Sequence, residues 1–258
     1  MRVTERMQSP TATLQEISDL IKSDVGLSTR ILRLANSSYY SIPGGVNDVP
    51  KALQYLGFTT IAQIVLTASV FGSFKSTGMT NFSLSQFWIH CFAVGQLAEV
   101  TARTLQHKNP SDAFIGGLMH DVGKLILLEL APDHLSKIVH IAKEGHISFI
   151  QAEQGLEYPN HIELGMELSR YWHLPIPVLQ AIEGHHGGST NPDALLVEWS
   201  DTWVNARHLG NSGNHDAEIE AKLEALTKKM GLQPKTLQTI EAHFLKEFEK
   251  AGAILGGH

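Results

Sequence analysis

The side chains in this sequence with the clearest chemical potential are histidines and aspartates on apolar helical stripes or at helix ends. Fourteen histidines occur among 258 residues, about twice what background usage gives a chain of this length. Imidazole nitrogen and carboxylate oxygen are donors that suit zinc, iron, manganese or nickel. Seven residues form the predicted metal-binding set: His90, His120, Asp121, His161, His185, His186 and Asp201.

Two members of this set are predicted to point inward from the apolar faces of helices. His90 lies three residues after Phe87, on the same side of its helix. Asp201 lies between Val197 and Val204 on one apolar face. A buried carboxylate is costly unless it is paired or bound to metal, so a cation is the simplest explanation for Asp201. A lone inward histidine is more often a hydrogen-bonded core residue than a ligand, which leaves both interpretations of His90 open.

The other members lie at predicted helix ends. The pair His120-Asp121 follows a helix, although such pairs also arise by chance. His161 follows the predicted cap Asn160, and Gly165, one turn later, would let a neighbouring helix approach closely. The pair His185-His186 precedes two glycines. Adjacent helical residues point about 100° apart, so both imidazoles reach one cluster only at a helix end. Each position could be a surface residue, whereas one metal cluster explains them all.

The elements that must position these side chains are predicted to be helices throughout. Apolar residues recur at helical spacing, and no stretch alternates convincingly with a period of two. In the first eighty residues, apolar stripes begin at Leu14, Leu27, Val49 and Ile61. Ser83 is predicted to cap the long helix that carries His90. Further helices are predicted over residues 109–121, 132–144, 148–156, 162–172, 176–184, 192–207, 217–230 and 234–250.

We therefore predict an all-α protein with a two-lobed helical fold. The first lobe, residues 1–80, carries almost no potential metal ligand, and the second, residues 81–210, carries the predicted set. Residues 211–258 are predicted to be a C-terminal helical extension, which begins with a linker at residues 211–214. This asymmetry indicates binding chemistry in the second lobe and an interaction surface in the first.

Composition limits the classes of function. Hydrophobic residues make up 43% of the chain and charged residues 18%, as in folded globular proteins. No apolar run is long enough to span a membrane, and the start of the chain lacks the apolar core of a signal peptide. A single cysteine, Cys91, cannot form an internal disulfide, so a cytoplasmic location is expected. The net charge of -6 without a basic block argues against a nucleic-acid polymer as partner.

Taken together, the predicted ligands resemble those of the HD superfamily of metal-dependent phosphohydrolases. An isolated histidine, a His-Asp pair and a distal aspartate follow its signature, here His90, His120-Asp121 and Asp201. Residues 120–124 match the His-Asp-x-Gly-Lys run of its two-metal branch, which includes the HD-GYP phosphodiesterases. His161, His185 and His186 resemble the additional metal ligands of that branch.

The first lobe resembles more narrowly the HDOD family. Residues 24–37 look like the opening of an HDOD domain, and residues 52–57 and 87–90 also fit. The resemblance covers roughly residues 14–205 and implies an all-α fold and a bacterial signalling role as an output or scaffold module.

Two features depart from the patterns of these families. Gly-Gly-Ser-Thr at residues 187–190 replaces the Gly-Tyr-Pro signature of HD-GYP enzymes, which argues against cyclic-di-GMP as a substrate. HDOD domains commonly lack several metal ligands and are usually regarded as non-catalytic, whereas this chain carries a full set.

Two hypotheses follow. In the first, this is a signalling or regulatory protein that has a signalling protein as partner and whose HD-type site holds one or two divalent ions of iron, manganese, nickel or zinc. In the second, it is a metal-dependent phosphohydrolase acting on a phosphate-containing small molecule or nucleotide.

The enzymatic hypothesis assigns a role to each residue of the set. One metal would take His90, His120, Asp121 and Asp201, and the other His161, His185 and His186, with Asp121 bridging. Two such ions about 3.5–4 Å apart would activate a water and hold the attacking and leaving oxygens of a phosphoester. Asp121 and Lys124 are the predicted catalytic residues, Lys124 contacting a phosphate oxygen; the alternative for Lys124 is a solvated lysine at a helix start.

Overall fold

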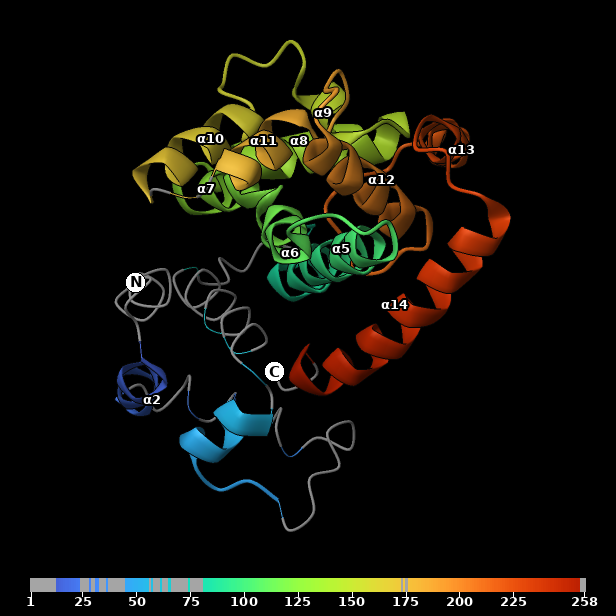
Figure 1. Ribbon diagram of the computed structural model, residues 1–258. Coiled ribbons are helices and arrows are strands. Elements are labelled where there is room, and N and C mark those ends of the chain that lie inside the picture. The colour runs from blue at the N-terminus through green and yellow to red at the C-terminus, as the bar shows by residue number, and fades with distance from the viewer. Residues whose placement is uncertain are drawn as a thin grey trace. The chain divides into compact units, whose positions relative to one another are not determined.

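The computed structural model describes residues 13–23, 28, 31–32, 36, 45–55, 57, 61, 65, 74, 81–172, 174 and 176–255 (Figure 1). Within these residues all regular structure is helical and no strand occurs, which confirms the all-α prediction. None of the helices in this described part is long and apolar enough to cross a membrane. The chain divides into two compact units, one formed by Met1–Phe74 with Leu245–His258 and the other by Lys75–Phe244.

The first unit contains helix α2 (Leu14–Lys22), which begins with a capping box. The Thr13 side chain accepts from the backbone N–H of Glu16, and the Glu16 carboxylate accepts from Thr13. Ile17 and Ile21 are fully buried, as the first predicted stripe requires. Residues 49–55 are also helical, with Val49 buried. Most of residues 24–37, on which the HDOD resemblance depends, lie outside the described residues.

The second unit is built from a longer series of helices. They are α5 (Leu84–Thr104), α6 (Pro110–Met119), α7 (Val122–Leu130), α8 (Pro132–Gly145), α9 (Phe149–Glu153), α10 (His161–Tyr171), α11 (Ile176–Gly184), α12 (Pro192–Ala206), α13 (Ile219–Lys229) and the first part of α14 (Pro234–Leu255). The predicted helix over residues 109–121 ends earlier than expected, because the chain turns at His120-Asp121 between α6 and α7. The predicted helix over residues 148–156 is also too long, because Gln154 is extended and Gly155 has a positive φ.

Local signals at the starts of two site-bearing helices are confirmed. The Ser83 side chain accepts from the backbone N–H of Gln86 at the start of α5. At the start of α10 the Asn160 side chain accepts from the backbone N–H of Glu163, and the Glu163 carboxylate accepts from the backbone N–H of Asn160. These caps set where each helix begins, and so where the histidines that follow point.

Glycines allow the helices beneath the site to approach closely. A Cβ on Gly117 of α6 would lie 2.7 Å from the Cα of Gly95 in α5. A Cβ on Gly123 of α7 would lie 1.8 Å from the carbonyl oxygen of His161 and 2.8 Å from the backbone nitrogen of Gly165. The predicted close approach at Gly165 is therefore confirmed, and its partner is α7.

The division of the chain expected from the sequence differs from these units at the C-terminal end. Residues 211–244 group with the second unit, so the domain limits 1–80, 81–210 and 211–258 remain a proposal. Residues 211–214 connect α12 to α13 without helical structure, as predicted for a linker, but Ser212 and Gly213 within this segment are buried. The segment groups with the second unit.

Replacing Gly123 tests the contact between α7 and α10. We expect Gly123→Ala to lower the free energy of unfolding by about 3 kcal/mol or more, because a backbone oxygen already occupies the space of the added methyl group. Gly145→Ala is the matched control, since its Cβ would meet only Ile147 side-chain atoms at 3.4 Å or more. Denaturant unfolding of both variants measures the effect, and equal stabilities would contradict this packing.

Candidate metal centre

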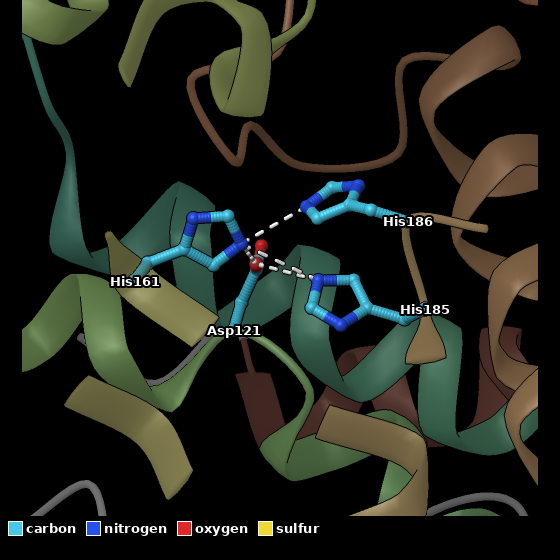
Figure 2. A group of neighbouring side chains, drawn as sticks. All are labelled: Asp121, His161, His185 and His186. Atoms are coloured by element: carbon cyan, nitrogen blue, oxygen red, sulfur yellow. Dashed lines mark hydrogen bonds and ion pairs between the residues drawn. The ribbon is translucent and has the colours of Figure 1, made fainter. Parts of the chain in front are cut away.

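The structure brings all seven predicted ligands together within the second unit. His90 comes from α5, His161 begins α10 and Asp201 comes from α12, whereas the other four lie in turns. The side chains form two groups, and within each group one ligand atom per residue lies within 4.8 Å of the others. The first group is Asp121, His161, His185 and His186 (Figure 2), and the second is His90, His120 and Asp201.

The carboxylate of Asp121 faces both groups. Its Oδ1 lies 3.5 Å from Nε2 of His161 and 3.5 Å from Nε2 of His185. Its Oδ2 lies 3.2 Å from Nε2 of His120, which belongs to the second group. Figure 2 shows the three imidazoles of the first group converging on this carboxylate. Asp121 therefore lies where a bridging ligand would be needed.

The second group is centred on the carboxylate of Asp201. Oδ1 of Asp201 lies 3.0 Å from Nε2 of His90 and 3.5 Å from Nε2 of His120. The burial of His90 and Asp201 that their apolar stripes predicted is confirmed. His90, His120 and Asp201 thus present two imidazole nitrogens and one carboxylate oxygen to a common point.

Hydrogen bonds behind the imidazoles orient them toward the site. Nδ1 of His120 lies 2.6 Å from the carbonyl oxygen of Gly117, and Nδ1 of His185 lies 2.8 Å from that of Ile182. A carbonyl oxygen can only accept, so Nδ1 carries the hydrogen in both residues. In a neutral ring Nε2 then holds the lone pair that a metal would bind.

Glu153 orients His161 in the same way, although sequence reasoning missed it. Its two carboxylate oxygens accept from the backbone N–H of His161 at 2.8 Å and from Nδ1 at 2.6 Å. A carboxylate behind a histidine is the usual outer partner of a metal-binding imidazole. Glu153 lies eight residues before His161 at the end of α9, and no periodic pattern relates the two.

The histidine pair lies beyond the end of α11, as its adjacent side chains require. The helix ends at Gly184, and residues 185–188 form turns in which Gly187 and Gly188 have φ values of 102° and 79°. Glycine adopts this backbone region without a steric cost. His185 is fully buried, whereas His186 is half-buried and precedes the two exposed glycines. The His186 side of the cluster is therefore its most accessible side.

Three buried ligand atoms support a fit to metal. Among the described residues, Nε2 of His90, Nε2 of His120 and Oδ1 of Asp121 are inaccessible to solvent and have no hydrogen-bond partner of acceptable geometry. Each of them nevertheless lies within 3.0–3.5 Å of a neighbouring imidazole nitrogen or carboxylate oxygen. These contacts are poorly directed as hydrogen bonds, and a cation held between the side chains would give all three atoms a directed partner.

Burial and charge set the protonation of the site. Burial lowers the pKa of His185 to about 4 and holds the pKa of His186 well below its usual value. Burial also acts to lower the pKa of His120, but the charges and hydrogen bonds of Asp121 and Asp201 outweigh it and raise this pKa to about 10. Burial opposes ionisation of both aspartates, yet the charge of His120 and its hydrogen bonds to them hold their pKa values well below the ordinary range.

Lys124 is part of this buried charge system. Its ammonium donates to Oδ2 of Asp121 at 2.7 Å and to the carbonyl oxygen of Ser212 at 3.1 Å, and it lies 4.2 Å from the ring centroid of Phe149. The interpretation of Lys124 as a solvated lysine is wrong, because only 1% of its surface is exposed. Its contact with a phosphate oxygen remains a prediction.

The fold is all-helical and carries a buried cluster of histidines and aspartates, and the family follows from comparison. The model of the HDOD domain family matches residues 1–187. This chain therefore belongs to the HDOD family.

Solved structures of other proteins share the fold of this chain. One solved structure, from Marinobacter aquaeolei VT8, is provisionally named a signal transduction protein and is 21% identical to this chain, with a TM-score of 0.77. The match covers 99% of this chain and 58% of the Marinobacter chain. Another solved structure, from Shewanella amazonensis SB2B, is provisionally named a metal-dependent phosphohydrolase and is 20% identical, with a TM-score of 0.68. This match covers 99% of this chain and 89% of the Shewanella chain. These likenesses concern the fold.

The curated relatives are longer proteins. An uncharacterized protein from Treponema pallidum (strain Nichols) is 26% identical over 187 residues, which are 72% of this chain and 36% of that protein. The chain spans about a third of the length of the curated relatives it matches.

Replacing Lys124 tests its role as an internal counter-charge. We expect Lys124→Met to destabilise the metal-free protein by about 3–5 kcal/mol, because it leaves Asp121 buried beside one fewer cation. Added divalent metal should raise the melting temperature of this variant more than that of the native protein, since the metal replaces the missing charge. Lys228→Met, at an exposed position of α13, is the control. A metal-free Lys124→Met variant as stable as the native protein would refute the role.

Proposed function

We propose that this chain is a bacterial HDOD signalling protein that binds divalent metal in its HD-type site. The observation that carries the proposal is the carboxylate of Asp121, which faces two groups of histidines and whose buried Oδ1 makes no well-directed hydrogen bond to the two imidazoles 3.5 Å away. The family assignment supports the signalling role, as does the likeness to a provisionally named signal transduction protein. We propose a signalling protein as partner of the first lobe, and a cytoplasmic location because of the single cysteine.

The proposed ligand sets follow the two groups. His161, His185 and His186 would hold one ion with Asp121, and His90, His120 and Asp201 would hold another, with Asp121 shared. Iron, manganese, nickel and zinc all accept this mixture of imidazole and carboxylate. A metal here would add positive charge beside two aspartates whose described cationic neighbours are His120 and Lys124.

Removal of the shared carboxylate provides the main test. We expect Asp121→Ala to lose metal from both positions, whereas His186→Ala should retain one ion, because only the first group contains His186. Elemental analysis after metal loading measures both effects. Asp133→Ala, at an exposed position in the first turn of α8, should bind as the native protein does.

Stability should follow metal content. Chelation should lower the melting temperature of the native protein, because a ligand bound only by the folded state stabilises it by mass action, and Asp121→Ala should not respond. If native protein purified without chelator and offered zinc, manganese, iron and nickel holds none of them, the metal proposal fails. The cluster would then be a hydrogen-bonded polar core within a regulatory module.

The second candidate function is metal-dependent phosphoester hydrolysis of a phosphate-containing small molecule or nucleotide. It is favoured by the bridging position of Asp121 together with the accessible side of the cluster at His186. Bound metals would supply Lewis acidity and lower the pKa of a water. Of the protein's own groups, Asp121 would hold the two positions together, and Lys124 would orient Asp121 and, as predicted, contact a phosphate oxygen.

Two substrates separate these functions. A hydrolase should cleave bis(p-nitrophenyl) phosphate when loaded with manganese, and Asp121→Ala should lose that activity; a binding module should show no turnover above the variant. We expect little or no hydrolysis of cyclic-di-GMP in either case, because Gly-Gly-Ser-Thr stands where HD-GYP enzymes have their signature. Rapid turnover of cyclic-di-GMP at low enzyme concentration would overturn that expectation.

A further inference from the structure

A chain of hydrogen bonds joins the two site aspartates through residues outside both groups. From Asp121 it passes to Lys124, whose ammonium also donates to the backbone carbonyl of Ser212. The hydroxyl of Ser212 then donates to Oδ1 of Asn205 at 3.1 Å, and Nδ2 of Asn205 donates to Oδ1 of Asp201 at 2.7 Å. We call Lys124, Ser212 and Asn205 the carboxylate link.

The segment that carries Ser212 is fixed on both sides. The backbone N–H of Asn211 donates to the carbonyl oxygen of Gln86 in α5, and the Asn214 side chain accepts from the backbone N–H of Phe149 at the start of α9. Ser212 itself is 2% exposed. The carbonyl of Ser212 is therefore held toward Lys124, and its hydroxyl is held toward Asn205.

The segment also passes directly over the backbone of His90. A Cβ on Gly210 would lie 2.4 Å from the backbone nitrogen of His90, and Gly210 has a φ of 74°. Glycine is required there both by the space and by the backbone conformation. The residues after α12 are thus seated against the site.

The chemistry of the link gives each aspartate a fixed orientation. Lys124 engages Oδ2 of Asp121, which leaves Oδ1 toward His161 and His185. Asn205 can donate to Asp201 only through its NH2, and the Ser212 hydroxyl, by donating to the amide oxygen, keeps the NH2 turned toward Asp201. Without that hydroxyl the amide could rotate, and Asp201 would lose a directed partner.

We propose that Asn205 and Ser212 are positioning residues that hold Asp201 at the separation from Asp121 that the second metal position requires. This inference rests on the proposed metal binding and deepens it. Both residues lie beyond the part of the chain that the HDOD family model matches, residues 1–187. The residues that follow the matched domain thus complete the site.

Ser212→Ala tests the link at its centre. The variant loses the hydroxyl but keeps the backbone carbonyl that holds Lys124, so only the Asp201 side of the link is broken. Removal of a residue that hydrogen-bonds a ligand directly, as Asn205 does Asp201, typically weakens metal binding about 10–100-fold. The Ser212 hydroxyl acts one bond further out, through Asn205, so we expect Ser212→Ala to weaken Co²⁺ binding at the His90, His120 and Asp201 position by a smaller but measurable factor, with the other position unchanged.

A second test variant and a control variant accompany Ser212→Ala. Asn205→Leu removes the donor to Asp201 and should reproduce the selective loss. Ser136→Ala is the matched control. The Ser136 hydroxyl, on α8, also donates to the Oδ1 of an asparagine, Asn81, at 3.1 Å, but this bond is not part of the carboxylate link. Calorimetric titration with Co²⁺ gives the number and affinity of the ions, and the visible absorption of the cobalt reports a changed ligand geometry. Melting curves of the metal-free variants establish that each is folded.

The outcomes separate this inference from the function on which it rests. Native protein that binds no Co²⁺ overturns the metal proposal and the inference with it. Native protein that binds a single ion, or a Ser212→Ala variant whose affinities and spectrum match the native protein, overturns the inference alone. An equal loss at both positions overturns it as well, since the link would then act on general stability. Selective weakening of one position, with Ser136→Ala unchanged, supports it.

Discussion

The carboxylate of Asp121 is the constraint around which the site is built. It is buried, its two oxygens face different groups of histidines, and Lys124 and His120 surround it with positive charge. A carboxylate in such a place is tolerated only because these partners are supplied. It reaches that place because the chain turns between α6 and α7, and because Gly123 lets α7 lie against the start of α10.

The charges of the site explain how one cluster can be both a polar core and a metal centre. Asp121 and Asp201 stay ionised beside His120, whose pKa the two aspartates raise to about 10 against the effect of burial. Burial keeps His185 and His186 neutral, which is the form that binds metal, whereas His120 would have to release its proton to act as a ligand. The protein therefore supplies two cations, His120 and Lys124, beside the two aspartates, while Oδ1 of Asp121 makes no hydrogen bond of good geometry.

Much of this arrangement could be predicted from local pattern. The apolar stripes of α5 and α12 place His90 and Asp201 inward, and a histidine pair before two glycines requires a helix end. Lys124 could not be placed in this way. Its partner Ser212 is 88 residues away and lies in a polar segment that looks like a linker, and only the tertiary fold buries both. Glu153 likewise reaches His161 across a loop without any repeating pattern.

The central claim is that Asp121 bridges two positions for divalent metal. Crystals of the native protein soaked in manganese, with diffraction recorded on both sides of the metal's absorption edge, test it most directly. Two anomalous peaks are expected, one on each side of the Asp121 carboxylate, the first among His161, His185 and His186 and the second beside His90, His120 and Asp201. A soaked crystal with no anomalous peak beside Asp121, or with a peak on one side of it only, would contradict that claim.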